Sequence, residues 1–419
     1  MKSTSFLILL LTMAMISSCS KDYDTAEIFY TKAIAKYGNL DEIRKIPLLG
    51  NVQTISNPGK IFVSDQFLLI GEEGKGIHLL DNSNPENPQP ISFINVPGNH
   101  EFFVHEQSIF AESYYDMLKI DFSIPRQPRL VSRVKNYFQP HLLNSTGENL
   151  IGFDFQKVTE KIRDNDQEFW NEYYLYNDIY VDHLQAVITH SAVPSSFAGS
   201  SQSIGSVNRI TRTKGHVYAI NRSKMAVFSD HDELALLGEG FYGSQMESIY
   251  PNGDHLFIGG SSSIEILNIT NPAKPHYSGS FLHPTSCDPV YPIDSVAYVT
   301  LRTDDDDICP GDVNALVVLD ITDVRIPQNV QEIEMLSPFG ISLIGDVLYV
   351  GEGENGLKIF DATDRHHLVL LKHDQSLKAY DVISHPTRMD LILVAGPHGF
   401  GQYSVTNTIK FSLLSWISF

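Results

Sequence analysis

The sequence predicts an all-β protein, a β-propeller of about eight four-stranded blades, with seven blades as the alternative. One observation behind this prediction is a strand-and-turn unit that recurs along the chain. A second is that short apolar strands lie on both sides of each copy. A third is composition: 28 Gly and 21 Pro among 419 residues, with only 19% charged residues, are typical of a turn-rich β protein.

The recurring unit is an apolar strand that ends in Asp or Asn and leads into a turn. Prolines follow Asp81, Asp121 and Asn268 by four and seven residues. Proline cannot donate to a sheet ladder, and an Asp or Asn side chain caps nearby backbone amides. We therefore interpret these strand-end residues as structural. In the clearest copies they are Asp81, Asp121, Asn268, Asp320 and Asp361.

The spacing of the copies is typical of propeller blades. Most copies lie 39 to 43 residues apart, and four short strands per 40 to 45 residues is the period of a blade. One interval is 108 residues long, which leaves room for a hidden unit around residues 149–155 and gives eight units in total. We expect residues 45–55 and 411–419 to be outer strands, so that the two ends of the chain share one blade and close the ring.

Each copy is preceded by a second apolar strand, and a further strand lies before that one. The predicted second strands are residues 67–71, 109–112, 217–220, 256–260, 296–301, 347–351 and 391–396.

The first residues have the pattern of an export signal. Residues 6–16 form an apolar run that is too short to span a bilayer. The sequence Ile-Ser-Ser-Cys that ends at Cys19 resembles a bacterial lipobox, which implies cleavage after residue 18 and lipidation of Cys19. The acidic residues after Lys21 resemble the surface-export tag of Bacteroidetes lipoproteins, with a simple charged tether as the alternative.

This organisation gives three parts: a signal peptide (1–18), a lipidated tether (19–43) with a short helix around residues 25–37, and a propeller (44–419). The expected location is the outer membrane, at the cell surface or on the periplasmic face. The lipid attaches the chain to the membrane, and we expect a monomer.

The two remaining cysteines are Cys287 and Cys309. In an oxidising compartment they are expected to form a disulfide. Two free buried thiols are the alternative.

The strands 316–320 and 357–361, with their turns, resemble LVIVD-repeat proteins, and residues 287–290, 297–302 and 402–404 resemble the lipoprotein branch of that family. The resemblance extends over about residues 45–419. It implies a surface or periplasmic β-propeller and carries no catalytic residue to this sequence.

No motif for catalysis or a cofactor is present, and the formal net charge of −20 does not suit a nucleic-acid binder. The run Asp304, Asp305, Asp306 and Asp307 is a weak Ca²⁺ candidate, with a solvated acidic turn as the alternative. His366, His367 and His373 form the densest group of histidines and are considered as a metal site. Neighbouring residues on a strand point to opposite faces, which disfavours a shared metal ion.

We therefore expect a non-enzymatic binding or scaffold module that recognises a glycan, peptide or protein. Tyrosines in predicted loops are candidates for stacking on such a ligand, with core or surface packing as the alternative: Tyr114, Tyr115, Tyr173, Tyr174 and Tyr242. The alternative is a carbohydrate-active enzyme, a glycoside hydrolase or lyase that uses carboxylates at the propeller mouth. A structural envelope protein is the third hypothesis. The carboxylates that follow second strands are Glu72, Glu73, Glu112, Glu352 and Glu354.

Overall fold

The computed structural model describes residues 25–137, 143–163, 208–221, 224–242, 246–284, 289–303, 311–407 and 409–419. The chain divides into two compact units, Met1–Lys36 with Gly152–Leu184 and Tyr37–Ile151 with Gln185–Phe419. The described part of the first unit belongs to a two-stranded sheet of β1 (Thr25–Gly38) and β11 (Asn149–Arg163). The described residues contain no helix with the length and apolarity to cross a membrane.

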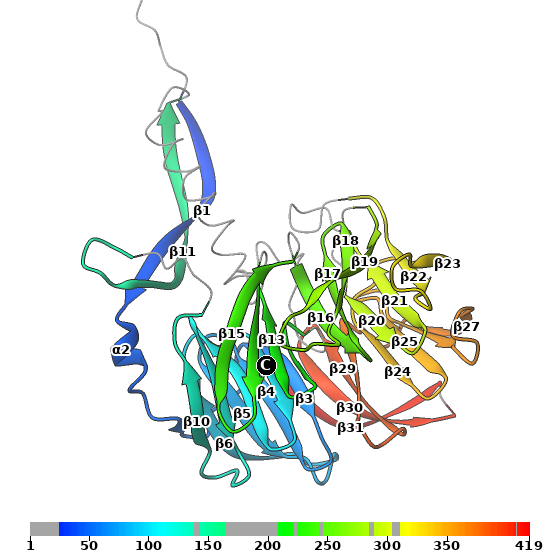
Figure 1. Ribbon diagram of the computed structural model, residues 1–419, viewed down its shortest axis with the longest axis horizontal. Helices are drawn as coiled ribbons and strands as arrows, with labels where there is room; N and C mark the ends of the chain where they lie inside the picture. The colour runs from blue at the N-terminus through cyan, green and yellow to red at the C-terminus, as the bar shows by residue number, and fades with distance from the viewer. Residues whose placement is uncertain are drawn as a thin grey trace, which may run out of the picture. The chain divides into compact units, whose positions relative to one another are not determined.

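The second unit is a propeller of seven four-stranded blades, whose strands follow one another in colour order in Figure 1. Blade 1 is β3 (Pro58–Val63), β4 (Phe67–Glu72), β5 (Gly76–Asp81) and β6 (Gln89–Asn95). Blade 2 is β7 (Phe102–His105), β8 (Ser108–Ser113), β9 (Asp116–Asp121) and β10 (Arg129–Val134). Blade 3 is β12 (Ile210–Thr213), β13 (His216–Ile220), β14 (Lys224–Asp230) and β15 (Leu234–Phe241).

The other four blades follow the same order. Blade 4 is β16 (Met246–Asn252), β17 (His255–Gly260), β18 (Ser263–Asn268) and β19 (His276–Leu282). Blade 5 is β20 (Val290–Ile293), β21 (Val296–Leu301), β22 (Ala315–Asp320) and β23 (Gln328–Glu334). Blade 6 is β24 (Ile341–Ile344), β25 (Val347–Gly351), β26 (Leu357–Asp361) and β27 (Val369–Asp374). Blade 7 is β28 (Asp381–Ser384), β29 (Leu391–Gly396), β30 (Gly399–Thr406) and β31 (Lys410–Ser418).

The all-β propeller is confirmed, and the count of seven is the one stated as the alternative. The count of eight was wrong because residues 149–155 belong to β11, which pairs with β1 and not with a blade. The helix expected around residues 25–37 is also wrong, since these residues lie in β1.

The blades are held together by apolar clusters between neighbours. Among the described residues, seven clusters each join two adjacent blades, and the last joins blade 7 to blade 1. On β4, Leu69 packs toward blade 2, whereas Leu68 and Ile70 pack toward blade 7. Because successive side chains of a strand point to opposite faces, both faces of the blade are buried. This double burial explains why the inner strands are nearly continuous apolar runs.

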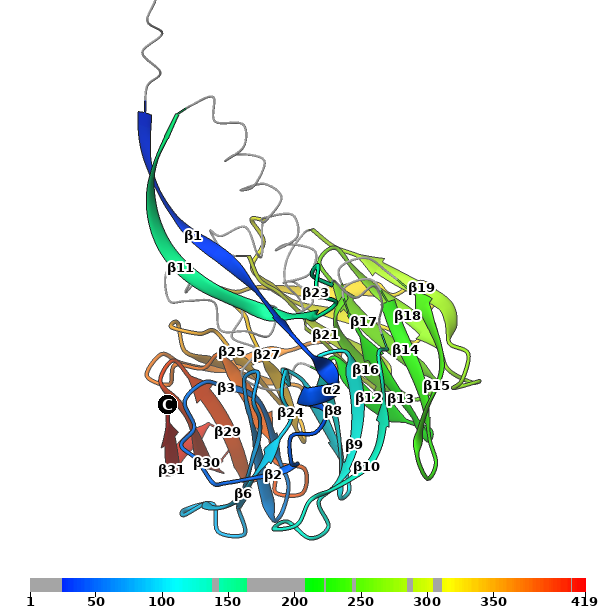
Figure 2. The ribbon, with the colours of Figure 1, turned by 90° about the vertical axis from the view of Figure 1, so that its left-hand side faces the viewer.

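The ring closes without the shared blade that we expected. Residues 411–419 do lie in or directly after an outer strand, β31 of blade 7. The predicted strand within residues 45–55 is reduced to β2 (Leu49–Gly50), which pairs with β6 on the outside of blade 1 (Figure 2). Closure instead uses the apolar cluster between blades 7 and 1 and a buried amide pair, Asn82 and Gln402. Asn82 Nδ2 donates to Gln402 Oε1 at 2.9 Å, and Gln402 Nε2 donates to Asn82 Oδ1 at 2.8 Å.

Two local features repeat in the blades. The ladder between the third and fourth strand shows a register shift in all seven blades, which twists the outer strand. The strand-end residues also act alike: each accepts the backbone N–H two residues further on, at 2.8 or 2.9 Å. These residues are Asp81, Asp121, Asn268, Asp320 and Asp361.

The segment before blade 1, which we call the strap (residues 39–57), runs along blades 1 and 2. It begins with the short helix α2 (Leu40–Ile43), capped by the Asn39 side chain, which accepts the Asp41 N–H at 2.9 Å. The Arg44 guanidinium then makes two hydrogen bonds of 2.8 Å to the Asp116 carboxylate of blade 2. Arg44 therefore holds the start of the strap against blade 2.

The amide pair at the ring closure gives a testable prediction. Asn82→Ala removes the donor to the buried Gln402 Oε1, while Gln402 Nε2 keeps its bonds to Pro85 O and Ser415 Oγ, so we expect a loss of about 1–3 kcal/mol in the free energy of unfolding. Urea titration followed by circular dichroism measures it. Asn87→Ala, in the same turn but exposed, is the control and should change stability little. Equal stability of the two variants would show that the apolar cluster closes the ring alone.

Candidate functional site

The first strand of each blade lines the centre of the ring. Contacts between β3 and β7, β7 and β12, β12 and β16, β16 and β20, and β24 and β28 follow this inner wall. We call the side of the ring at which these first strands begin the upper face. Because neighbouring strands are antiparallel, the turn between the second and third strand of each blade lies at the same face. The upper face therefore collects residues from every blade.

One carboxylate at this face, Glu72, accepts hydrogen bonds at both of its oxygens from residues that hold the fold together. Its oxygens accept the backbone N–H groups of Ser56 and Asn57 at 3.1 Å, the Ser56 hydroxyl, and Lys75 Nζ at 3.2 Å. His78 Nε2 lies 3.1 Å away. Burial acts to raise the pKa of Glu72, but the hydrogen bonds outweigh it and lower the pKa to about 2. Glu72 therefore anchors the strap to blade 1 and does not serve as an acid or base.

Glu352 has the equivalent role in blade 6. This fully buried carboxylate accepts the Leu336 N–H at 2.7 Å and lies 3.1 Å from Lys358 Nζ and 3.2 Å from His373 Nε2. His373 is thus engaged with Glu352, while His366 lies 3.7 Å from Asp320. In the part of the chain that the structure describes, no three metal-ligating side chains come together.

A second set of charged side chains comes together at the upper face. We call it the mouth cluster: Lys60, Glu73, His100, Glu101, Glu112, Arg209 and Asp381. The residues of the mouth cluster belong to blades 1, 2, 3 and 7.

Lys60 and Arg209 are the buried cations of the mouth cluster. The Lys60 ammonium lies 2.7 Å from Asn208 Oδ1 and 3.7 Å from Glu101 Oε1. Burial lowers the pKa of Lys60, and the charges of Glu101 and Asp381 oppose the shift. Arg209 donates its Nε to a backbone oxygen of blade 4 at 3.2 Å and interacts electrostatically with Glu101. Cations from two blades therefore face carboxylates from two others.

Glu73 is paired with His100, whose Nδ1 lies 2.5 Å from Glu73 Oε2. Burial raises the pKa of Glu73, and His100 opposes the shift. The carboxylate lies directly over Gly59, where a Cβ atom would overlap Glu73 Oε1. Asp381 lies over Gly340 in the same way. The two glycines allow carboxylates to approach the backbone of the inner strands closely.

Glu112 is the mouth carboxyl whose protonation changes near neutral pH. Burial raises its pKa to about 7; the charges of Glu101 and Glu73 add to this shift, while His100 and Arg209 oppose it. A carboxyl group with such a pKa is able to donate or accept a proton at neutral pH.

Several buried polar atoms at the mouth have no hydrogen-bond partner among the described residues. Asn99 donates both amide hydrogens to the Glu101 and Glu112 carbonyls, at 2.8 and 3.0 Å, but its Oδ1 accepts none. Ser248 Oγ is also without a hydrogen bond, and so is Glu101 Oε1, whose ion-pair partner Lys60 Nζ lies 3.7 Å away. Buried polar atoms are nearly always paired with protein or water. These atoms therefore mark places for water or for polar groups of a ligand.

The described tyrosines named from the sequence are used in packing. Tyr115 donates to the Leu150 carbonyl at 2.7 Å, and burial raises its pKa to about 12. Tyr242 donates to the Pro275 carbonyl at 3.4 Å, and the ring of Tyr114 lies against Gly98. Tyr173 and Tyr174 lie outside the described residues.

The other residues predicted from the sequence also lie outside the described part of the chain: Cys19, Cys287, Cys309, Asp304, Asp305, Asp306 and Asp307.

A groove of about 780 Å³ opens on the opposite, lower face between blades 1 and 2. It is lined by Ser64, Asp65, Gln66, Phe67, Glu106, Gln107, Ser108, Asp121 and Ser123. None of these polar side chains is buried, and Asp121 already bonds Ser123 and Arg129. The mouth cluster is therefore the better candidate site.

Sequence reasoning missed Lys60, Arg209 and Asp381. Each stands at or near the start of a first strand, next to apolar residues. Aligning the first strands of all blades would have shown charged residues recurring at one level of the ring.

The family comparison agrees with this architecture. The LVIVD repeat model matches residues 339–373, which contain β24 to β26 and most of β27. Blade 6 is therefore similar to an LVIVD repeat. No curated protein matches the sequence.

Several solved structures are similar to this one in fold. A functionally unknown protein from Desulfotomaculum acetoxidans is 10% identical with a TM-score of 0.54, over 84% of this chain and 95% of that chain. The periplasmic gluconolactonase PpgL of Pseudomonas aeruginosa is 12% identical with a TM-score of 0.54, over 84% and 96%. Sqt1 of Saccharomyces cerevisiae is 10% identical with a TM-score of 0.50, over 88% and 87%. At these identities the likeness concerns the fold alone.

The Glu72 anchor predicts a pH dependence of stability. Its folded pKa of about 2 lies below the ordinary 4.5, so its contribution is present above pH 4.5 and is lost as the pH falls toward 2. Glu72→Gln should cost roughly 2–3 kcal/mol at pH 7, and this difference from the wild type should shrink between pH 4.5 and 2. Denaturant titrations across this range measure it. Glu86→Gln, an exposed change in the same blade, should show no such pH dependence; a constant Glu72→Gln difference would contradict the assignment.

Proposed function

We propose that this LVIVD-repeat propeller is a lipid-anchored binding protein of the bacterial outer membrane, of Bacteroidetes type, that holds a polar ligand at the mouth cluster. The ligand class is a glycan, a peptide or a protein surface. The observation that carries the proposal is the convergence at the mouth of charges from blades 1, 2, 3 and 7 around Glu101, a buried carboxylate with an oxygen that lacks a hydrogen-bond partner among the described residues.

The mixed charge of the mouth supports binding over catalysis. Lys60 and Arg209 lie within reach of Glu101, so the carboxylate is held by fixed cations. Fixed, opposite charges with spare acceptors suit a ligand with several polar groups, since each such group replaces a water at a prepared position.

A carbohydrate-active enzyme remains the second candidate, because Glu112 has a pKa of about 7 beside Glu73 and Glu101. General acids of glycosidases are carboxyl groups with a raised pKa. The discriminating observation is turnover: release of reducing ends from a bound glycan, abolished by Glu112→Gln, would favour the enzyme.

The anchoring part of the proposal rests on the lipobox-like sequence before Cys19, and two acyl chains are enough for stable membrane attachment. We also propose that Cys287 and Cys309 form a disulfide in the oxidising compartment outside the inner membrane.

Binding at the mouth is tested on glycan and peptide arrays. We expect the wild type to bind a defined subset, and Glu101→Gln to lose at least tenfold in affinity for the same spots, because a neutral amide no longer pairs with Lys60 or presents a charged acceptor. Glu354→Gln is the matched control, because Glu354 is an upper-face carboxylate that is 53% exposed. Equal binding by Glu101→Gln and Glu354→Gln would place the ligand elsewhere.

Anchoring is tested by metabolic labelling with an alkyne fatty acid. The wild type and Cys287→Ala should be labelled and fractionate with the outer membrane, whereas Cys19→Ala should carry no label. Protease treatment of intact cells then distinguishes the cell surface from the periplasmic face. Labelling of Cys19→Ala would refute lipidation at this residue.

A further inference from the structure

The outer strand of blade 7 differs from the other outer strands of the ring. In blade 1 the outer edge is already paired, because β2 covers part of β6. β31 has nine residues, whereas the other outer strands have six to eight. An unpaired strand edge presents a row of N–H and C=O groups that another strand is able to bond. β31 is therefore the longest outer edge of the propeller.

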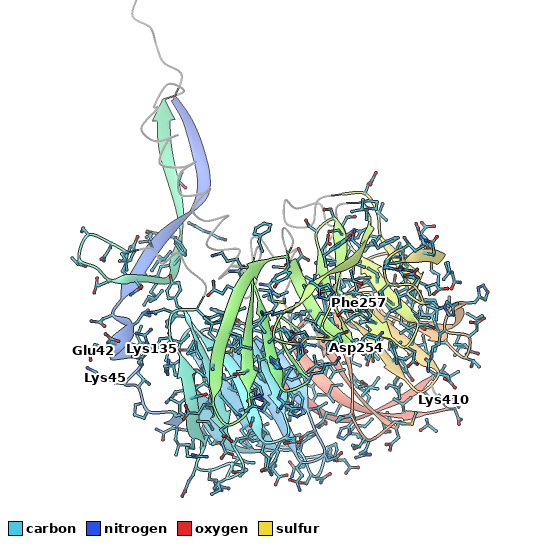
Figure 3. The ribbon with its side chains drawn as sticks, viewed as in Figure 1. Glu42, Lys45, Lys135, Asp254, Phe257 and Lys410 are labelled. Carbon is cyan, nitrogen blue, oxygen red and sulfur yellow. The ribbon has the colours of Figure 1, made fainter. Side chains whose placement is uncertain are left out.

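The side chains of this strand do not protect its edge. After Lys410, which Figure 3 labels at the start of β31, residues 411–419 contain no charged side chain. Leu413 is 54% exposed and Trp416 is 45% exposed. By contrast, the outer strands of blades 2 and 5 carry charged residues, which discourage pairing with another chain.

The sequence of this strand is nearly a palindrome. Residues 411–419 read Phe-Ser-Leu-Leu-Ser-Trp-Ile-Ser-Phe, with Ser415 at the centre. Antiparallel pairing of two copies around Ser415 places Phe411 opposite Phe419, and serine opposite serine at positions 412 and 418. Leu413 then meets Ile417, and Leu414 meets Trp416. In this register apolar residues face apolar residues and serine faces serine, so the strand is complementary to a second copy of itself.

The ladder irregularity within blade 7 confines regular pairing to the residues on either side of it. β31 has its extra residue at Leu414, between the partners of Gln402 and Tyr403. β6 has its extra residue at the equivalent place, and β2 still pairs with β6 just beyond it, at Phe93 and Ile94. The equivalent residues of β31 are Trp416 and Ile417. The protein itself thus shows a strand added to an outer edge at this level of a blade.

We infer that a second copy of this chain pairs with β31 through antiparallel strand addition, which joins two propellers rim to rim about a twofold axis at Ser415. This inference is independent of the ligand proposed for the mouth cluster. It replaces the expectation of a monomer with a symmetric dimer. The apolar side chains of β31 supply the buried contacts, and the backbone edge supplies the hydrogen bonds.

Cysteine cross-linking of the full chain in membranes tests the register. Co-expressed Ser412→Cys and Ser418→Cys chains should form a disulfide-linked dimer on a non-reducing gel, because residues directly opposite each other in an antiparallel ladder have Cα atoms about 4.5–5.5 Å apart. Ser412→Cys alone and Ser418→Cys alone should stay monomeric. Equal cross-linking of Ser412→Cys alone and of the co-expressed pair would overturn the inference, because it would indicate random collision.

Sedimentation of the detergent-solubilised full chain tests the contact without cysteine. Leu413→Lys should raise the dimer dissociation constant at least tenfold, because it places a charge at the shared ladder. Leu370→Lys is the matched control, since Leu370 of β27 occupies the equivalent ladder position and is 51% exposed. It should leave the dimer unchanged. A monomeric wild type at micromolar concentration, or a dimer that Leu413→Lys does not weaken, would overturn the inference, as would a different protein paired with β31.

Discussion

Every blade of this propeller has to be covered on both faces, and the rest of the structure depends on this constraint. A single four-stranded sheet with Leu68, Leu69 and Ile70 on one strand exposes apolar side chains on two sides. Each side is buried only when a neighbouring blade packs against it, and the last blade needs the first. A ring satisfies all blades together, so the apolar clusters between blades carry most of the stabilisation. The Asn82–Gln402 pair adds a specific contact where the ends of the ring meet.

The same constraint produces the candidate site. The first strands converge at the centre, where space is limited. Polar side chains at the upper ends of these strands are therefore buried next to one another. Burial raises the pKa values of Glu73, Glu101 and Glu112 and lowers that of Lys60. The geometry of the ring brings the charged side chains together. The balance of positive and negative charge depends on which blades carry acidic residues and which carry basic residues.

The outer edges of the blades are not buried in this way, because no neighbouring blade covers them. β6 is partly covered by the strap, and the outer strands of blades 2 and 5 carry charges. β31 has neither device along residues 411–419. The repeated sequence pattern thus determines the inner strands of every blade. The outer strands vary, and they determine which contacts the rim of the propeller makes with other molecules.

The sequence by itself determined the blade architecture, the second strand of each blade and the Asp or Asn turns after the third strand. These features follow from local chemistry: apolar runs form buried strands, and side-chain oxygens cap amides two residues away. It also placed the carboxylates of the second-strand ends at one face, since strand direction alternates within a blade. Only the tertiary structure decided the number of blades, because residues 149–155 have a strand-like sequence and pair with β1. It alone separated Glu72 and Glu352, which anchor neighbouring segments, from the carboxylates of the mouth. It alone brought Lys60, Arg209 and Asp381 together, because contacts between first strands depend on ring closure, which joins residues far apart in the chain.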